Sequence, residues 1–201
     1  MSDLKVSISP GNTKMGAIPS VSLPPVETCP HDAPCFHDCY ARRLCAMRPP
    51  MKTAYEINLQ IWNTNPAAYL EAVDNAIKMT RYFRFHVGGD IPDRRYAAMI
   101  WTLAQHHPQT EILCFTKQYE IVNETVRKFG LPPRNLHLIF SAWPGKEIEN
   151  EFDFPVCQVL FKGQTPDPSW KLCTGNCTQC ALTDCGCWTL QTGETICIPK
   201  H

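Results

Sequence analysis

Hydrophobic and polar positions alternate with two different periods along this chain, and the two periods predict an α/β fold. Runs with strand-like alternation or continuous apolar character lie at 21–23, 81–87, 111–116, 136–142 and 154–161. Apolar residues at helical spacing predict helices at 40–47, 52–62, 66–78, 93–106 and 119–129. Because strands and helices alternate, we expect parallel βαβ units with ligands at the carboxyl ends of the strands.

Two short stretches stand at such strand ends. Gly88-Gly89-Asp90 follows one predicted strand, and Ser141-Ala142-Trp143 closes another. Paired glycines let the backbone approach a ligand closely, and the carboxylate of Asp90 is placed to bind an amine. Glycine and aspartate are also ordinary turn residues, so this stretch alone does not separate a ligand site from a turn.

Three cysteines lie in a proline-bounded loop, residues 29–39, which we call the N-terminal cysteine loop. Cys29, Cys35 and Cys39 are separated by five and three residues, and a helical pattern follows at once. Three thiolates can hold three irons of a 4Fe–4S cluster and leave one iron open. Zinc is the alternative, and it requires a fourth ligand. The candidates for that ligand are His31, His37 and Cys45. The residue types leave both alternatives open.

A denser group of five cysteines occupies residues 173–187, the C-terminal cysteine segment. Gaps of two and three residues allow adjacent thiolates to face one metal, and four thiolates complete a site. The ligands that we predict are Cys173, Cys177, Cys180 and Cys187. They would hold a second 4Fe–4S cluster or a structural zinc. The composition changes at Gly163, so we predict a division into residues 1–162 and a cysteine-rich lobe of residues 163–201.

Charge and hydropathy limit the classes of function. The 201 residues carry 19 Lys and Arg against 19 Asp and Glu, a formal charge of zero, which argues against a broad nucleic-acid or membrane-binding surface. The sequence shows no apolar signal core and no membrane-spanning stretch, so we expect a cytoplasmic location. Thiols stay reduced there, and the 12 cysteines then favour metal binding over disulfides. Cys114 and Cys157 lie in strand patterns and are expected to be buried small hydrophobic residues.

Several segments together carry a resemblance to known families. They are Asn12-Thr13-Lys14-x-Gly16, Cys35-x3-Cys39-Tyr40-Ala41, His86-Val87-Gly88-Gly89-Asp90, and the terminal cysteines followed by Trp188. These segments resemble the phage "gene product 88" family over nearly the whole chain. The order of a strand, a three-cysteine loop, a helix and a strand ending in a Gly-Gly-acid turn is also similar to the radical S-adenosylmethionine superfamily.

The superfamily resemblance implies a partial parallel (β/α) barrel of five to six strands with a cysteine-rich C-terminal lobe. It implies that the N-terminal cysteine loop ligates a 4Fe–4S cluster whose open iron binds S-adenosylmethionine. The cofactor-binding residues implied in this way are Gly88, Gly89, Asp90 and Tyr40. An electron donor would reduce the cluster, and the cleaved cofactor would release a 5′-deoxyadenosyl radical that abstracts hydrogen from an unknown substrate.

Two other interpretations remain open. The chain could be a non-catalytic protein that holds zinc or clusters at both ends in a structural or interaction role. It could also be a barrel-like protein that keeps a cluster for electron transfer or sensing.

Overall fold

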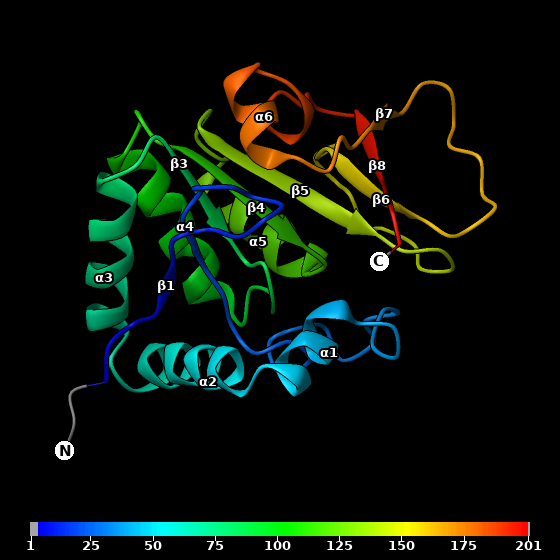
Figure 1. Cartoon of the computed structure of the whole chain (residues 1–201). Coiled ribbons are helices and arrows are strands. Elements are labelled where there is room, and N and C mark those ends of the chain that lie inside the picture. Colours follow the sequence, from blue (N-terminus) through cyan, green and yellow to red (C-terminus); the bar gives the residue numbers. More distant parts are fainter. Residues whose placement is uncertain (1–3, 201) are drawn as a thin grey trace.

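A computed structural model describes residues 4–200, which form one open eight-stranded sheet flanked by helices (Figure 1). The strands are β1 (Ile8–Ser9), β2 (Ser20–Val21), β3 (Tyr82–Phe85), β4 (Glu111–Thr116), β5 (Leu136–Ala142), β6 (Val156–Leu160), β7 (Lys171–Leu172) and β8 (Thr195–Pro199). The α-helices are α1 (Tyr40–Met47), α2 (Pro49–Thr64), α3 (Pro66–Lys78), α4 (Arg94–His106), α5 (Tyr119–Phe129) and α6 (Cys177–Leu182), and Gly186–Trp188 forms a 3-10 turn, η1. Within residues 4–200, no helix has the length and apolar character required to cross a membrane.

The regular elements follow from local sequence chemistry. Helix α3, for example, begins at the predicted position because the Asn65 side chain accepts a hydrogen bond from the Ala68 backbone N–H at 3.1 Å. Pro66 occupies the first turn of that helix, where its missing N–H costs nothing. The predicted bounds of α1, α3, α5, β4 and β5 agree with the structure.

The sheet has eight strands rather than the predicted five or six, and it does not close into a barrel. Its order is β1-β2-β3-β4-β5-β6-β8-β7, and only the β1–β2 pair is antiparallel. Strands β1 and β7 have two residues each, which is too short for a hydrophobic period to show. The pattern therefore predicted the inner strands and missed both edges, together with β8.

The two faces of the sheet are covered by different parts of the chain. On one face, Phe83, Phe85 and Phe140 pack against residues of α2 to α5 in the larger hydrophobic core. On the other face, Leu113 and Ile139 pack against Met15 and Ile18, which lie between β1 and β2, and against residues of the C-terminal cysteine segment. Figure 1 shows α6 on this second face. Because successive residues of a strand point to opposite faces of the sheet, each strand contributes side chains to the hydrophobic layers on both faces.

The C-terminal cysteine segment is anchored directly to the sheet. The Tyr82 hydroxyl donates to the Ala181 carbonyl oxygen at 2.8 Å, and the Tyr82 ring packs edge-on against Trp188 with ring centroids 5.0 Å apart. The backbone N–H of Cys177 donates to the Lys14 carbonyl oxygen at 3.0 Å. The predicted boundary at residue 162 falls between β6 and β7, and the chain beyond it adds two strands to the same sheet.

Candidate functional site

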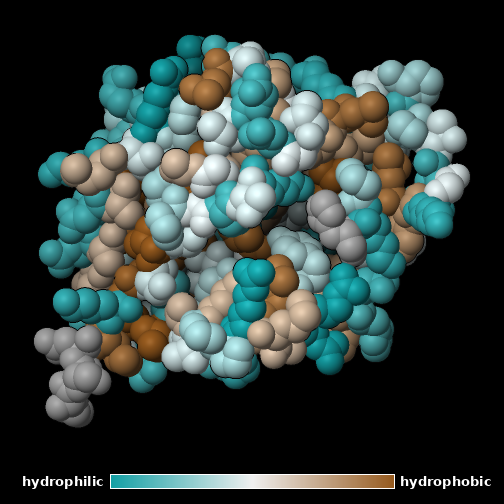
Figure 2. Space-filling model, viewed as in Figure 1, coloured by the Kyte–Doolittle hydropathy of each residue, from teal (hydrophilic) through white to brown (hydrophobic). Residues whose placement is uncertain are grey.

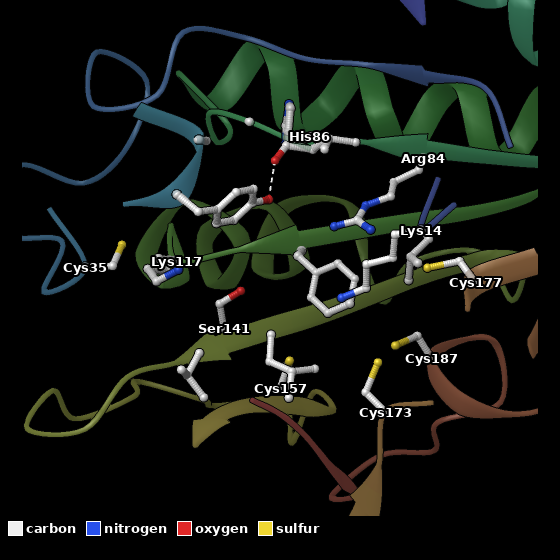
Figure 3. A pocket seen from close by; sticks show the side chains of 18 of the residues that line it. Lys14, Cys35, Arg84, His86, Lys117, Ser141, Cys157, Cys173, Cys177 and Cys187 are labelled. Carbon is white, nitrogen blue, oxygen red and sulfur yellow. Dashed lines mark hydrogen bonds between the residues drawn. The ribbon is translucent and has the colours of Figure 1, made fainter. Parts of the chain in front are cut away.

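A cavity of about 210 Å³ lies on the second face of the sheet, between the two cysteine groups (Figure 3). Its floor is formed by residues from five parallel strands: Arg84, Leu113, Ser141, Cys157 and Ile196. The N-terminal cysteine loop forms one wall and the C-terminal cysteine segment forms the other. The space-filling view shows the surface hollowed near the middle of this side, with hydrophilic and hydrophobic residues around the opening (Figure 2).

The three thiols of the N-terminal cysteine loop line one end of this cavity. Cys39 is the N-cap residue of α1, and its Sγ accepts a hydrogen bond from the Arg42 backbone N–H at 3.5 Å. Burial raises the pKa of Cys29 to about 12, and the nearby Asp90 carboxylate contributes to this rise. In the metal-free protein Cys29 is therefore a thiol at neutral pH, and a bound cation would favour the thiolate.

The three candidates for a fourth zinc ligand do not line the cavity with these thiols. His31 and His37 lie on the outer part of the loop, and Cys45 is packed inside α1. All three lie outside the cavity wall.

The turn after β3 holds the N-terminal cysteine loop in place. Gly89 has φ +78°, and a Cβ atom there would lie 2.5 Å from the Leu23 carbonyl oxygen. The next residue, Asp90, donates its backbone N–H to the Thr28 hydroxyl at 2.9 Å. Thr28 directly precedes Cys29, so this turn sets the position at which the first thiol enters the cavity wall.

Asp90 lines the cavity, but its carboxylate is also bound by the protein. Oδ1 accepts from the Thr116 hydroxyl at 2.5 Å and from the Ile91 backbone N–H at 2.8 Å. Oδ2 accepts from the Lys117 backbone N–H at 2.8 Å. Burial raises the pKa of Asp90, and these hydrogen bonds oppose the rise. Asp90 thus joins the ends of β3 and β4 as well as facing the cavity, and sequence reasoning missed this structural role.

The remaining predicted cofactor-binding residues meet at the same end of the cavity. Tyr40 begins α1 and donates its hydroxyl to the Val87 carbonyl oxygen at 2.5 Å. Gly88 allows close helix packing, because a Cβ atom there would lie 2.9 Å from Cε2 of Tyr55. His86 adopts φ +59°, and burial lowers its pKa to about 3, so its imidazole is neutral at this edge of the cavity. A left-handed conformation at a non-glycine residue is a feature that concentrates at functional sites.

The opposite wall carries the four C-terminal cysteines that the spacing singled out. Cys173, Cys177, Cys180 and Cys187 all line the cavity, whereas Cys185 lies outside its wall. Figure 3 shows Cys173, Cys177 and Cys187 together at this end, far from Cys35 at the other. The Sγ atom of Cys180 lies 3.3 Å from the Thr174 hydroxyl oxygen.

Cys157 joins this group from the cavity floor. It is buried, as its strand pattern predicts, and burial raises its pKa to about 12 with a further contribution from Cys173. Burial also raises the pKa of Cys187, and the nearby thiols of Cys157 and Cys173 add to the effect. The closeness of Cys157 to this group has no signal in the sequence, because only the fold brings β6 beside the C-terminal cysteine segment.

The donor chemistry is compatible with iron–sulfur clusters, which are held mainly by thiolates. Within residues 4–200, no three or more His, Cys, Asp or Glu side chains are arranged to hold a metal ion. The thiols are instead spread around the two ends of one cavity.

Arg84 and Lys117 are charged residues of the cavity that were not predicted as site residues. Arg84 lies on β3 between Phe83 and Phe85, and a charged residue inside a strand covered on both faces is the signal that could have identified it. Lys117 directly follows β4, where the rule for parallel strand ends places ligand-binding residues.

Comparison with known proteins gives one match. No curated protein and no solved structure is similar to this chain at a significant level. Among families, the match is to the model described as "Gene product 88", and it extends over residues 4–188. These comparisons do not support the resemblance to the radical S-adenosylmethionine superfamily. With nearly its whole length matched, this chain belongs to the Gene product 88 family.

Proposed function

We propose that this protein is an iron–sulfur enzyme that binds S-adenosylmethionine at the N-terminal cysteine loop and cleaves it reductively. The observation that carries the proposal is the meeting of Cys29, Cys35 and Cys39 with the turn at residues 88–90 at one end of one cavity. Segments far apart in sequence thus supply a thiolate set and a backbone turn to the same space. The position of His31, His37 and Cys45 outside the wall favours a cluster with an open iron over a four-ligand zinc site.

When bound, such a cluster would supply the single electron for reductive cleavage of S-adenosylmethionine, which would start radical chemistry on the substrate. The roles of the protein are to hold the cluster, to orient S-adenosylmethionine and to exclude water from the site. The N-terminal cysteine loop holds the cluster. The backbone of Gly88 and Gly89 and the carboxylate of Asp90 orient the methionine end, and Tyr40 keeps α1 against that turn through its hydrogen bond to Val87.

The proposal also assigns roles to an electron donor, to the cavity and to the C-terminal cysteine segment. The electron comes from a separate donor protein, and the substrate enters the cavity between the cysteine groups. The C-terminal cysteine segment holds a second 4Fe–4S cluster or a structural zinc. A cytoplasmic location fits these roles because thiols stay reduced there.

Electron paramagnetic resonance of anaerobically purified, reduced protein tests this function. We expect a cluster signal that changes shape when S-adenosylmethionine is added, because the nucleoside would ligate the open iron. Formation of 5′-deoxyadenosine under reducing conditions would establish cleavage. A signal that ignores the nucleoside would contradict the proposal.

The second candidate is a non-catalytic metal protein, in which the C-terminal cysteine segment holds zinc and stabilises the fold. The anchoring of this segment through Tyr82 and Trp188 favours that possibility. Zinc in the elemental analysis, together with no cluster signal, would identify it. A redox-active cluster without nucleoside cleavage would instead indicate electron transfer or sensing.

Replacement of Asp90 by alanine is expected to weaken S-adenosylmethionine binding at least tenfold without removing iron, because the carboxylate that faces the amine is lost. The loss of its hydrogen bonds to Thr116 and Lys117 should also lower the free energy of unfolding by about 1–3 kcal/mol. Calorimetric titration and thermal melts measure the two effects separately. Thr116→Val is the matched control, since it removes one hydrogen bond to the carboxylate and a second one from the Gln118 backbone N–H, and keeps the carboxylate itself. Unchanged affinity in Asp90→Ala would refute the assigned contact.

A further inference from the structure

Arg84 places a guanidinium in the middle of the cavity floor. Its neighbours Phe83 and Phe85 belong to the helix-covered core, so the Arg84 side chain projects from the opposite face of the sheet. Its guanidinium carbon lies 4.9 Å from the centroid of the Phe115 ring. The Nε atom is buried and, among the residues that the structure describes, finds no hydrogen-bond partner.

Lys117 adds a second cation to the same cavity, nearer the N-terminal cysteine loop (Figure 3). No carboxylate within residues 4–200 forms an ion pair with Arg84 or Lys117. The two carboxylates on the wall have partners of their own. Asp38 pairs with Lys200 at 2.8 Å, and Asp90 is held by the hydrogen bonds described above.

Half-buried cations without a counter-ion are unfavourable, because they give up hydration and gain no opposite charge in return. A planar guanidinium with free N–H groups matches a carboxylate or a phosphate, which it can bind through two parallel hydrogen bonds. We propose that the space between the two cysteine groups binds a carboxylate or phosphate group of an anionic substrate through Arg84 and Lys117. The identification of this anion as part of the substrate rests on the proposed function.

The position of Arg84 also suits that role geometrically. It lies on the floor between the wall that carries the N-terminal cysteine loop and the wall that carries Cys173, Cys177 and Cys187 (Figure 3). An anion held there would lie beside the end of the cavity that carries the turn at residues 88–90. The substrate would thereby be held close to the proposed site of S-adenosylmethionine cleavage.

Tryptophan fluorescence offers a direct test, because Trp143 and Trp188 both line the cavity. The full metal-loaded chain is titrated with inorganic phosphate and, separately, with succinate, in a chloride buffer of constant ionic strength. We expect saturable binding of at least one probe, and the two titrations distinguish a phosphate site from a carboxylate site. Arg84→Met should weaken that binding at least tenfold, and Arg84→Lys should weaken it less because the charge is kept.

Arg81→Met is the matched control. Arg81 stands three residues earlier, stacks on the ring of Tyr82 with 5.4 Å to its centroid, and lies outside the cavity wall. Its loss should leave the titration unchanged. Equal titrations for the parent and Arg84→Met would overturn the anion site.

Three further measurements decide what Arg84 and Lys117 bind. Loss of iron in Arg84→Met would show that the cations balance the charge of the thiolates, and it would overturn the proposal. Competition between the probe and S-adenosylmethionine would assign the anion to the methionine carboxylate and overturn the substrate class. A cluster signal that ignores the nucleoside, with an intact anion titration, would overturn the proposed function and leave the anion site standing.

Discussion

Replacement of Cys35 or Cys39 by alanine is expected to remove the iron held by the N-terminal cysteine loop and to leave the metal of the C-terminal cysteine segment in place. Two remaining thiolates cannot hold three irons of a cluster, and the other candidate donors nearby lie outside the cavity wall. Iron and acid-labile sulfide per chain measure the loss. Any cluster signal that responds to S-adenosylmethionine should disappear with the iron.

Cys45→Ala is the control for this experiment. Cys45 lies only a few residues away in α1, and it is buried outside the cavity wall, so its removal should cost a modest amount of packing and no iron. The complementary variant, Cys177→Ala, should keep the signal that the nucleoside alters. Equal metal content in Cys35→Ala and the parent protein would refute the assignment of the loop.

Gly89→Ala is expected to lower the stability of the fold strongly, because the added methyl group meets both backbone strain and a steric clash. At φ +78° an L-residue is strained by about 1–2 kcal/mol. The new Cβ would also lie 2.5 Å from the Leu23 carbonyl oxygen and 2.8 Å from the Thr28 hydroxyl oxygen. The backbone of Leu23 cannot move aside as a flexible side chain can, so the bond between Thr28 and Asp90 should break.

The total loss should exceed about 3 kcal/mol, when the strain is added to a lost buried hydrogen bond and a steric clash. For a chain of this size, that corresponds to a melting temperature lower by roughly 6–12 °C. Because Thr28 precedes Cys29, iron binding by the loop should fall as well. Thermal melts of the purified variant, followed by circular dichroism, measure the shift.

Gly163→Ala isolates the contribution of backbone strain. Gly163 has a similar φ of +87°, but no heavy atom lies within 4 Å of its added Cβ. Strain alone should lower the melting temperature by roughly 2–8 °C, because it costs about 1–2 kcal/mol. Equal decreases in melting temperature for the two variants would mean that the close approach of Leu23 to the turn does not contribute to the destabilisation.

Local pattern was sufficient for the inner elements of the fold. The apolar spacing of Tyr69, Val73 and Ile77 predicts α3, and all three side chains are fully buried in the larger core. Strand–helix alternation predicted the parallel inner sheet, and the structure confirms an α/β fold with a mostly parallel sheet. These features depend on residues that are close together in the sequence, and hydrophobic periodicity is detectable over that range.

The edges of the sheet could not be predicted in the same way. Strands β1 and β7 have two residues each and exist because longer partners offer them hydrogen bonds. Strand β8 pairs with β6 across a long intervening segment, so its membership in the sheet depends on how that segment folds. The partial barrel of five to six strands implied by the superfamily resemblance was wrong, because the structure has an open eight-stranded sheet.

Two groups of thiols and a Gly-Gly-Asp turn at a strand end can be read from local spacing. The folded chain adds that both groups face one cavity, that Cys157 lies beside the second group, and that Asp90 is already held by Thr116. It also places Arg84 in that cavity with a buried Nε that, within residues 4–200, has no hydrogen-bond partner. The physical reason is range: spacing fixes which residues are neighbours along a loop or strand, whereas contacts between distant segments depend on the order in which strands pair and on the face of the sheet that each segment covers.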